Sequence, residues 1–222
     1  MRNLLILLFF AVSQPVCFAS LEDALNATCK VSTKQGAGSG VVYAQDDKHF
    51  YIGTAAHVIL NNKNEALASE TTFYNNGFRS HKIKSEIMFW AYKEKTVTDF
   101  AIIRVKKEDF RNYPHPKPVP FAKKDYNIDR LDVVISYGCA RGGWPTGWKG
   151  HVTETSPEGI KVKPFPIQGR SGSAVFNEDA SRVLGIIVWR NGYCISNRRV
   201  AELWEEAALI ISKGKIDNVL EK

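Results

Sequence analysis

The sequence PIQGRSGSAVF, residues 166–176, places Ser171 between two glycines and then runs directly into an apolar segment. Glycine permits backbone conformations and close approaches that a Cβ atom would forbid. A tight turn just before a buried strand aims backbone N–H groups at one point beside an exposed hydroxyl. That geometry suits attack on a carbonyl carbon and stabilisation of the oxyanion that forms. A hydroxyl is a weak nucleophile, so it needs a base, and the base needs an orienting group.

Two other stretches offer these groups. His57 follows a strand-like run and two alanines, which are small enough to let other parts of the chain approach the imidazole. Asp99 stands at the start of an apolar run, where a partly buried carboxylate must find a hydrogen-bond donor. Alone, His57 would be interpreted as a structural histidine and Asp99 as a turn residue. Their order along the chain with Ser171 is what indicates an active site.

Short strand-like runs, rich in β-branched and aromatic residues and separated by turn signals, dominate the chain. They cover residues 28–33, 38–43, 49–54, 70–74, 82–91, 100–105, 131–137, 148–153, 159–162, 174–176 and 183–189. This pattern predicts an all-β fold of sandwiches or barrels. One helix is expected at the end, because apolar residues from Val200 to Ile211 recur at helical spacing. Asn197 is its expected N-cap and Gly214 its stop.

The first nineteen residues are typical of a secretory signal peptide. A short basic start precedes an unbroken apolar run over 4–12, and small residues lead to a cleavage point after Ala19. A buried N-terminal strand and a lipoprotein acylated at Cys17 are weaker alternatives. No stretch is long enough to span a membrane stably. We therefore expect a secreted or periplasmic protein.

Four prolines within residues 112–120 indicate a stiff, extended linker near the middle of the mature chain. The expected organisation is a signal peptide over 1–19, one barrel over 20–113, and a second barrel with the C-terminal helix over 114–222. The composition, with 44% hydrophobic and 24% charged residues among 222, is that of an ordinary globular protein.

The formal net charge of +7 comes from scattered basic residues. This favours solvated strand faces over nucleic-acid binding, while attraction to an acidic surface or substrate stays open. No Cys-x-x-Cys occurs and the five histidines are far apart, so we expect no metal and no cofactor. After cleavage Cys29, Cys139 and Cys194 allow at most one disulfide. The pairing is open, with a slight preference for Cys139–Cys194.

Together these motifs resemble the trypsin-like (chymotrypsin-fold) serine proteases, in the style of the bacterial glutamyl-endopeptidase and HtrA-like branches but without a PDZ domain. The matching segments are GSGVV at 38–42, TAAH at 54–57, DFAI at 99–102, GRSGSAV at 169–175 and LGIIVW at 184–189. The resemblance covers nearly the whole mature chain. It implies two antiparallel six-stranded β-barrels with the active site between them.

The resemblance also implies roles for individual residues. Ser171 would attack the scissile carbonyl, His57 would transfer the proton, and Asp99 would orient the imidazole and stabilise its cation. The backbone N–H groups of Gly169 and Ser171 would form the oxyanion hole. Ser173 is a rival nucleophile, which we reject because the glycine-serine-glycine setting belongs to Ser171.

Val188, Trp189 and Arg190 are expected to pair with a protein or peptide substrate in extended conformation. By alignment, the specificity pocket contains no carboxylate, so cleavage after Lys or Arg is not expected. Arg190 instead suggests a preference for Glu or Asp. The protein is expected to be a monomer.

Arg170 departs from the family pattern, in which Asp or Asn usually occupies this position. An arginine cannot pair with a new N-terminal amine, so activation by propeptide cleavage is not expected. Arg170 also raises an alternative, in which a distorted oxyanion loop leaves a catalytically inactive binding protein on the same scaffold.

Overall fold

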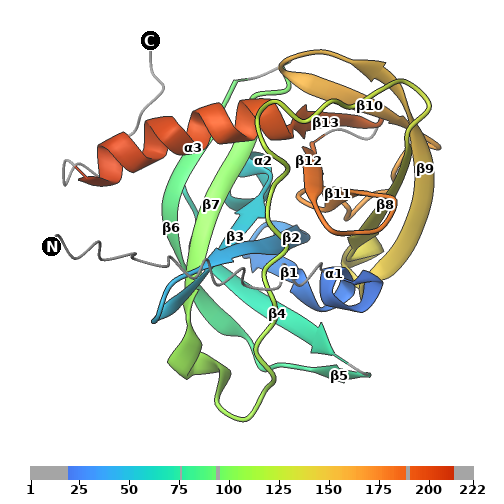
Figure 1. Ribbon diagram of the computed structural model, residues 1–222. Helices are drawn as coiled ribbons and strands as arrows, with labels where there is room; N and C mark the ends of the chain where they lie inside the picture. Colours follow the sequence, from blue (N-terminus) through green and yellow to red (C-terminus); the bar gives the residue numbers. More distant parts are fainter. Residues whose placement is uncertain (1–19, 76, 94–95, 189–190, 213–222) are drawn as a thin grey trace, which may run out of the picture.

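The structure, a computed structural model, describes residues 20–75, 77–93, 96–188 and 191–212. It confirms the predicted all-β architecture of two closed, antiparallel six-stranded barrels and a C-terminal helix (Figure 1). The expected signal peptide, Trp189, Arg190 and Gly214 lie outside the described residues. No helix in the described part of the chain is both long and apolar enough to cross a membrane.

The first barrel is built from strands that follow one another in the order β1-β2-β3-β7-β6-β4 and close through pairing of β1 with β4. A short strand, β5, extends the sheet beyond β4. The strands are β1 (Thr28–Thr33), β2 (Gly36–Gln45), β3 (His49–Thr54), β4 (Ser69–Asn75), β5 (Phe78–Arg79), β6 (Ile83–Tyr92) and β7 (Asp99–Lys106). Phe50, Phe73 and Phe100 are fully buried in its core, so aromatic side chains fill much of the interior.

The second barrel closes in the order β10-β13-β12-β11-β8-β9. Its strands are β8 (Val133–Gly138), β9 (Thr146–Thr155), β10 (Gly159–Lys163), β11 (Ala174–Asn177), β12 (Val183–Ile187) and β13 (Tyr193–Ser196). Smaller side chains such as Val134, Val162 and Leu184 fill its core. β13 was not predicted as a strand, although it completes the ring between β10 and β12.

The proline-rich stretch lies between the last strand of the first barrel and the first strand of the second. It is attached to both barrels, because the Val119 N–H donates to Val42 O at 3.0 Å and Pro120 O accepts the Val183 N–H at 2.9 Å. Figure 1 shows this segment running across the molecule between the barrels.

Two short helices that the sequence analysis did not predict precede the C-terminal one. Helix α1 (Leu21–Ala27) begins directly after Ser20, which forms a capping box with Asp23. A Ser-x-x-Asp sequence before a helix is a recognisable start signal, but it was not used. A four-residue helix, α2 (Ala56–Ile59), follows β3 and contains His57.

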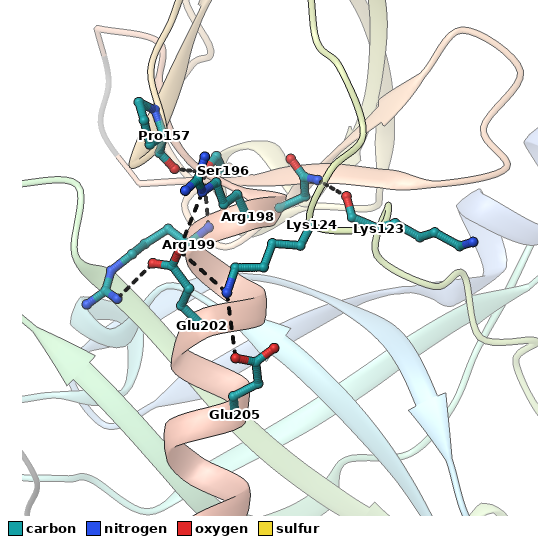
Figure 2. A network of polar contacts seen from close by, with 9 residues as sticks. Lys123, Lys124, Pro157, Ser196, Arg198, Arg199, Glu202 and Glu205 are labelled. Atoms are coloured by element: carbon teal, nitrogen blue, oxygen red, sulfur yellow. Dashed lines mark hydrogen bonds and ion pairs between the residues drawn. The ribbon is translucent and has the colours of Figure 1, made fainter.

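Helix α3 (Asn197–Ser212) leaves β13 without a linker (Figures 1 and 2). Its cap is Ser196 rather than the predicted Asn197, because the Ser196 Oγ accepts the Arg199 N–H at 3.2 Å. The same hydroxyl donates to Pro157 O at 2.6 Å. Asn197 is the first helical residue, and its side-chain amide donates to Lys123 O at 2.7 Å. The start of α3 is thus fixed to two loops of the second half of the chain.

The expected disulfide is not present: Cys29, Cys139 and Cys194 are all free, and all are buried. Cys194 belongs to the core of the second barrel, whereas Cys29 belongs to the core of the first. The preferred Cys139–Cys194 pairing fails because Cys139 lies at the contact between barrels. There its N–H donates to the Ser39 Oγ at 2.9 Å.

Candidate active site

One cavity of about 680 Å³ is lined by residues of both barrels. The structure brings His57 and Asp99 of the first barrel and Gly169 and Ser171 of the second to the walls of this cavity. Val188 lines it as well. Residues more than a hundred positions apart in the sequence therefore share one concave surface.

The imidazole and the carboxylate are placed by strand pairing in the first barrel. β3 pairs with β7 so that Thr54 lies opposite Ala101, which brings the short helix after β3 next to the start of β7. Asp99 Oδ2 lies 2.5 Å from His57 Nδ1, and Asp99 Oδ1 accepts the backbone N–H of His57 at 2.9 Å. The Asp99 side chain is 1% exposed and that of His57 is 37% exposed. A buried carboxylate thus orients an imidazole that still reaches solvent.

Ser171 lies in a turn of the second barrel that we call the Ser171 loop, residues 166–173. The Ser171 carbonyl accepts the Ser39 N–H of the first barrel at 2.7 Å, which ties this loop across the contact between barrels. Ser171 is partly exposed toward the cavity. Ser173 is fully buried, and its hydroxyl has no partner within the described residues. Exposure therefore distinguishes the two serines as the sequence interpretation did.

No hydrogen bond joins the Ser171 hydroxyl to His57 in the described residues. The imidazole is instead held from its other side by Asp99. In ligand-free enzymes, catalytic hydrogen bonds are often long and shorten only when substrate binds.

Gly169 occupies a position that only glycine fits. Its φ is +91°, and a Cβ atom would lie 2.4 Å from Arg141 N and 2.7 Å from Cys139 O. Both contacts come from the β8–β9 turn, residues 139–145. The turn is also hydrogen-bonded to the Ser171 loop, because the Arg141 N–H donates to Gln168 O at 2.8 Å. The backbone of the Ser171 loop therefore packs directly against the backbone of the β8–β9 turn.

These bonds fix the direction of two N–H groups. In a trans peptide the C=O and the following N–H point in opposite directions, and both peptides concerned are trans. Because Gln168 O faces the β8–β9 turn, the Gly169 N–H points away from it. Arg170 O accepts the Ser173 N–H at 2.9 Å, so the Ser171 N–H points away from Ser173. Neither N–H donates to a protein acceptor in the described part of the chain.

Arg170 does not enter the cavity. The residue is 3% exposed, and its Nη2 donates to Thr146 O at 2.7 Å and to Thr146 Oγ1 at 2.8 Å, with Gly147 O at 3.3 Å. Burial lowers the pKa of its guanidinium. The side chain is directed toward the start of β9 instead.

The remaining walls of the cavity carry little charge. Pro166, Ile167, Gln168 and Asn191 line it, and within the described residues Asp99 is the only carboxylate that does. The Val188 N–H is occupied by Tyr193 O at 3.0 Å.

Sequence reasoning missed the residues that support the site. The Ser39 hydroxyl donates to Gly169 O at 3.0 Å, and the Ser171 loop is also hydrogen-bonded to Arg141 of the β8–β9 turn and to Thr146 of β9. A signal existed for Ser39, because it stands between Gly38 and Gly40 in a recognised motif. Nothing in the sequence around Arg141 or Thr146 marks their contacts.

Several solved structures share this fold, and two of the three described here are proteases. The serine endoprotease from Yersinia pestis is 22% identical, with a TM-score of 0.65 over 87% of this chain and 67% of that one. Deg5 is 17% identical, with a TM-score of 0.62 over 80% and 87%. An inactive form of the Rv3671c protease is 19% identical, with a TM-score of 0.59 over 83% and 90%. At these identities the likeness is one of fold.

The comparison with curated protein sequences gave no match. The family described as the trypsin-like peptidase domain matches residues 38–186, which include both halves of the cavity described above. The match spans well over half of the sequence. This chain belongs to the trypsin-like peptidase family.

Proposed function

We propose that the protein is an exported serine endopeptidase. Ser171 attacks the scissile carbonyl, and His57 accepts the hydroxyl proton and later delivers it to the leaving amine. Asp99 holds the imidazole in the required tautomer and stabilises its cation. The N–H groups of Gly169 and Ser171 bind the oxyanion of the tetrahedral intermediate.

One observation carries this proposal. The imidazole bonded to a buried carboxylate lines the same cavity as the partly exposed Ser171 and the neighbouring Gly169. The His57–Asp99 pair alone, or the Ser171 loop alone, could have a purely structural role. Their meeting in one cavity of a trypsin-like peptidase favours acyl transfer over a binding role. The burial of Arg170 away from the cavity weighs against the inactive alternative.

The substrate we propose is an extended polypeptide lying beside β12 and the residues that follow it. Val188, Trp189 and Arg190 remain the proposed contacts. The uncharged wall of the cavity disfavours a lysine or arginine before the cleaved bond. Profiling with a peptide library tests this, and efficient cleavage after basic residues would contradict it. An acidic preference depends on Arg190 and is decided by the same profile.

Export is proposed from the signal-like sequence of residues 1–19. Cleavage after Ala19 would leave helix α1 with its complete cap, because Ser20 forms the capping box with Asp23. N-terminal sequencing of protein recovered from the medium or the periplasm tests this proposal. An unprocessed N-terminus in both fractions would contradict it.

Labelling with a fluorophosphonate probe tests the activity. The wild-type protein should be labelled and should cleave fluorescein-labelled casein, and Ser171→Ala should lose both properties. Ser173→Ala is the matched control and should keep both, because Ser173 is buried away from the cavity. Failure of the wild type to react while the variants stay folded would favour the binding-protein alternative.

A further inference from the structure

Arg170 adjoins the nucleophile in sequence, yet its side chain anchors the loop on the face turned away from the cavity. The guanidinium reaches the start of β9, where Thr146 supplies a carbonyl and a hydroxyl and Gly147 supplies a second carbonyl. Thr146 and Gly147 pair with Gly138 and Tyr137 of β8. The arginine therefore attaches the Ser171 loop to the strand pair that carries the β8–β9 turn.

The same turn holds the loop one residue earlier. The Arg141 N–H donates to Gln168 O at 2.8 Å, and the backbone of Cys139 and Arg141 packs against Gly169. The loop is thus held by the turn before Gly169 and by the Arg170 side chain after it. Together with the Ser39 hydroxyl, which donates to Gly169 O at 3.0 Å, these two attachments restrain the peptide planes on either side of Gly169.

Burial of the Arg170 guanidinium is expected to lower the stability of the folded protein. A buried charge normally needs a carboxylate partner, and here the acceptors are two carbonyls and one hydroxyl. Its Nη1 is buried and has no protein acceptor within the described residues. Features that cost stability are expected where function requires them.

We infer that Arg170 is a positioning residue, which keeps the Gly169 N–H directed into the cavity by fixing the Ser171 loop to β9. This inference rests on the proposed hydrolytic function. Arg170 does not touch the substrate in this arrangement. It acts through the donor that stabilises the oxyanion.

The test replaces the charge while keeping the bulk. In Arg170→Met, kcat on fluorescein-labelled casein should fall about 100-fold, the size of effect expected for losing one oxyanion donor, with KM within about twofold. The rate of fluorophosphonate labelling should fall in parallel. The thermal midpoint should change little, because removal of a buried charge without a carboxylate partner offsets the lost hydrogen bonds.

Two further variants refine the test. Arg170→Lys keeps the charge and one donating nitrogen in place of three, and its kcat should be about tenfold higher than that of Arg170→Met. Arg182→Met is the matched control, because Arg182 donates to Ser181 O in the same barrel away from the cavity, and its kcat should equal that of the wild type. If Arg170→Met does not fold, Arg170→Lys and Thr146→Val decide the question. Thr146→Val removes only the hydroxyl acceptor and should lower kcat without raising KM.

The possible outcomes distinguish failure of the proposed role of Arg170 from failure of the proposed peptidase activity. An active wild type with kcat within twofold in Arg170→Met overturns the role of Arg170 and leaves the peptidase intact. If the activity of Arg170→Lys and Thr146→Val falls only in proportion to a loss of folded protein, the role is structural and the inference is also overturned. A folded wild type without labelling or turnover overturns both.

Discussion

The two halves of the candidate active site are held in different ways. The His57–Asp99 pair comes wholly from the first barrel, where the pairing of β3 with β7 and two hydrogen bonds fix it. The Ser171 loop belongs to the second barrel but is held by Ser39 of the first and by Arg170. One half is therefore complete within its own barrel, whereas the other depends on the contact between barrels.

The largest effect is expected from a substitution in the His57–Asp99 pair. Asp99→Asn keeps the shape of the side chain but offers the imidazole the wrong hydrogen-bonding partner, so kcat should fall about 10⁴-fold. Steady-state kinetics measures this, with Asp109→Asn, at a partly exposed position that does not line the cavity, as the control. Equal kcat values for Asp99→Asn and the wild type would remove Asp99 from the mechanism.

The second-largest effect is expected from a substitution inside the Ser171 loop. Gly169→Ala places a Cβ against Arg141 N and Cys139 O at a φ of +91°, so the loop must shift. We expect kcat to fall about 10²–10³-fold while the His57–Asp99 pair stays intact. Gly143→Ala in the same β8–β9 turn meets only Ala140 O at 3.3 Å and should be nearly neutral. An active Gly169→Ala variant would show that the loop conformation does not matter.

A smaller effect tests the contact between barrels. Ser39→Ala removes the bond to Gly169 O and leaves the buried Cys139 N–H without its acceptor. We expect about a tenfold fall in kcat and a loss of about 1–3 kcal/mol in the free energy of unfolding. Ser69→Ala is the control, because the Ser69 hydroxyl is buried without a partner in the described residues. The measurements are denaturant unfolding and steady-state kinetics. Equal changes in kcat and in the free energy of unfolding for Ser39→Ala and Ser69→Ala would contradict the account.

The smallest effect uses the thiols as reporters. Burial raises the pKa of Cys139 to about 12, so at pH 8 almost no thiolate is present and alkylation by iodoacetamide should be slow. Raising the pH from 8 toward 10 should accelerate the reaction. The Ser39 hydroxyl lowers the pKa of Cys139, so in Ser39→Ala Cys139 should react more slowly than in the wild type, whereas the rate for Cys194 inside the second barrel should not change. Mass spectrometry of the alkylated peptides distinguishes the two cysteines.

Local signals made much of the fold predictable. Alternating β-branched and aromatic runs gave most strands, and the family resemblance supplied the two barrels. α1 was missed although its capping box was readable, and β13 was missed because four residues before a helix carry little pattern. A disulfide was expected from cysteine count and compartment, but Cys29 and Cys194 lie in different cores and Cys139 lies at the contact between the barrels.

The site likewise contains residues that could be predicted from the sequence and residues that could not. His57, Asp99 and Ser171 were found from short motifs, because each stands at the end or start of a strand in a recognisable setting. The direction of the Arg170 side chain could not be predicted, since it depends on acceptors on β9 that only the barrel closure brings near. Ser39 was quoted in a motif without a role, because its partners lie 100 and 130 residues away along the chain.

The most direct test of the account is a crystal structure of the protein after reaction with a fluorophosphonate. We predict a covalent bond from the phosphorus to the Ser171 Oγ, with the phosphoryl oxygen within hydrogen-bonding distance of the N–H groups of Gly169 and Ser171. The imidazole of His57 should lie beside the adduct with its bond to Asp99 retained. An adduct on another residue, or a phosphoryl oxygen directed away from Gly169, would contradict the account.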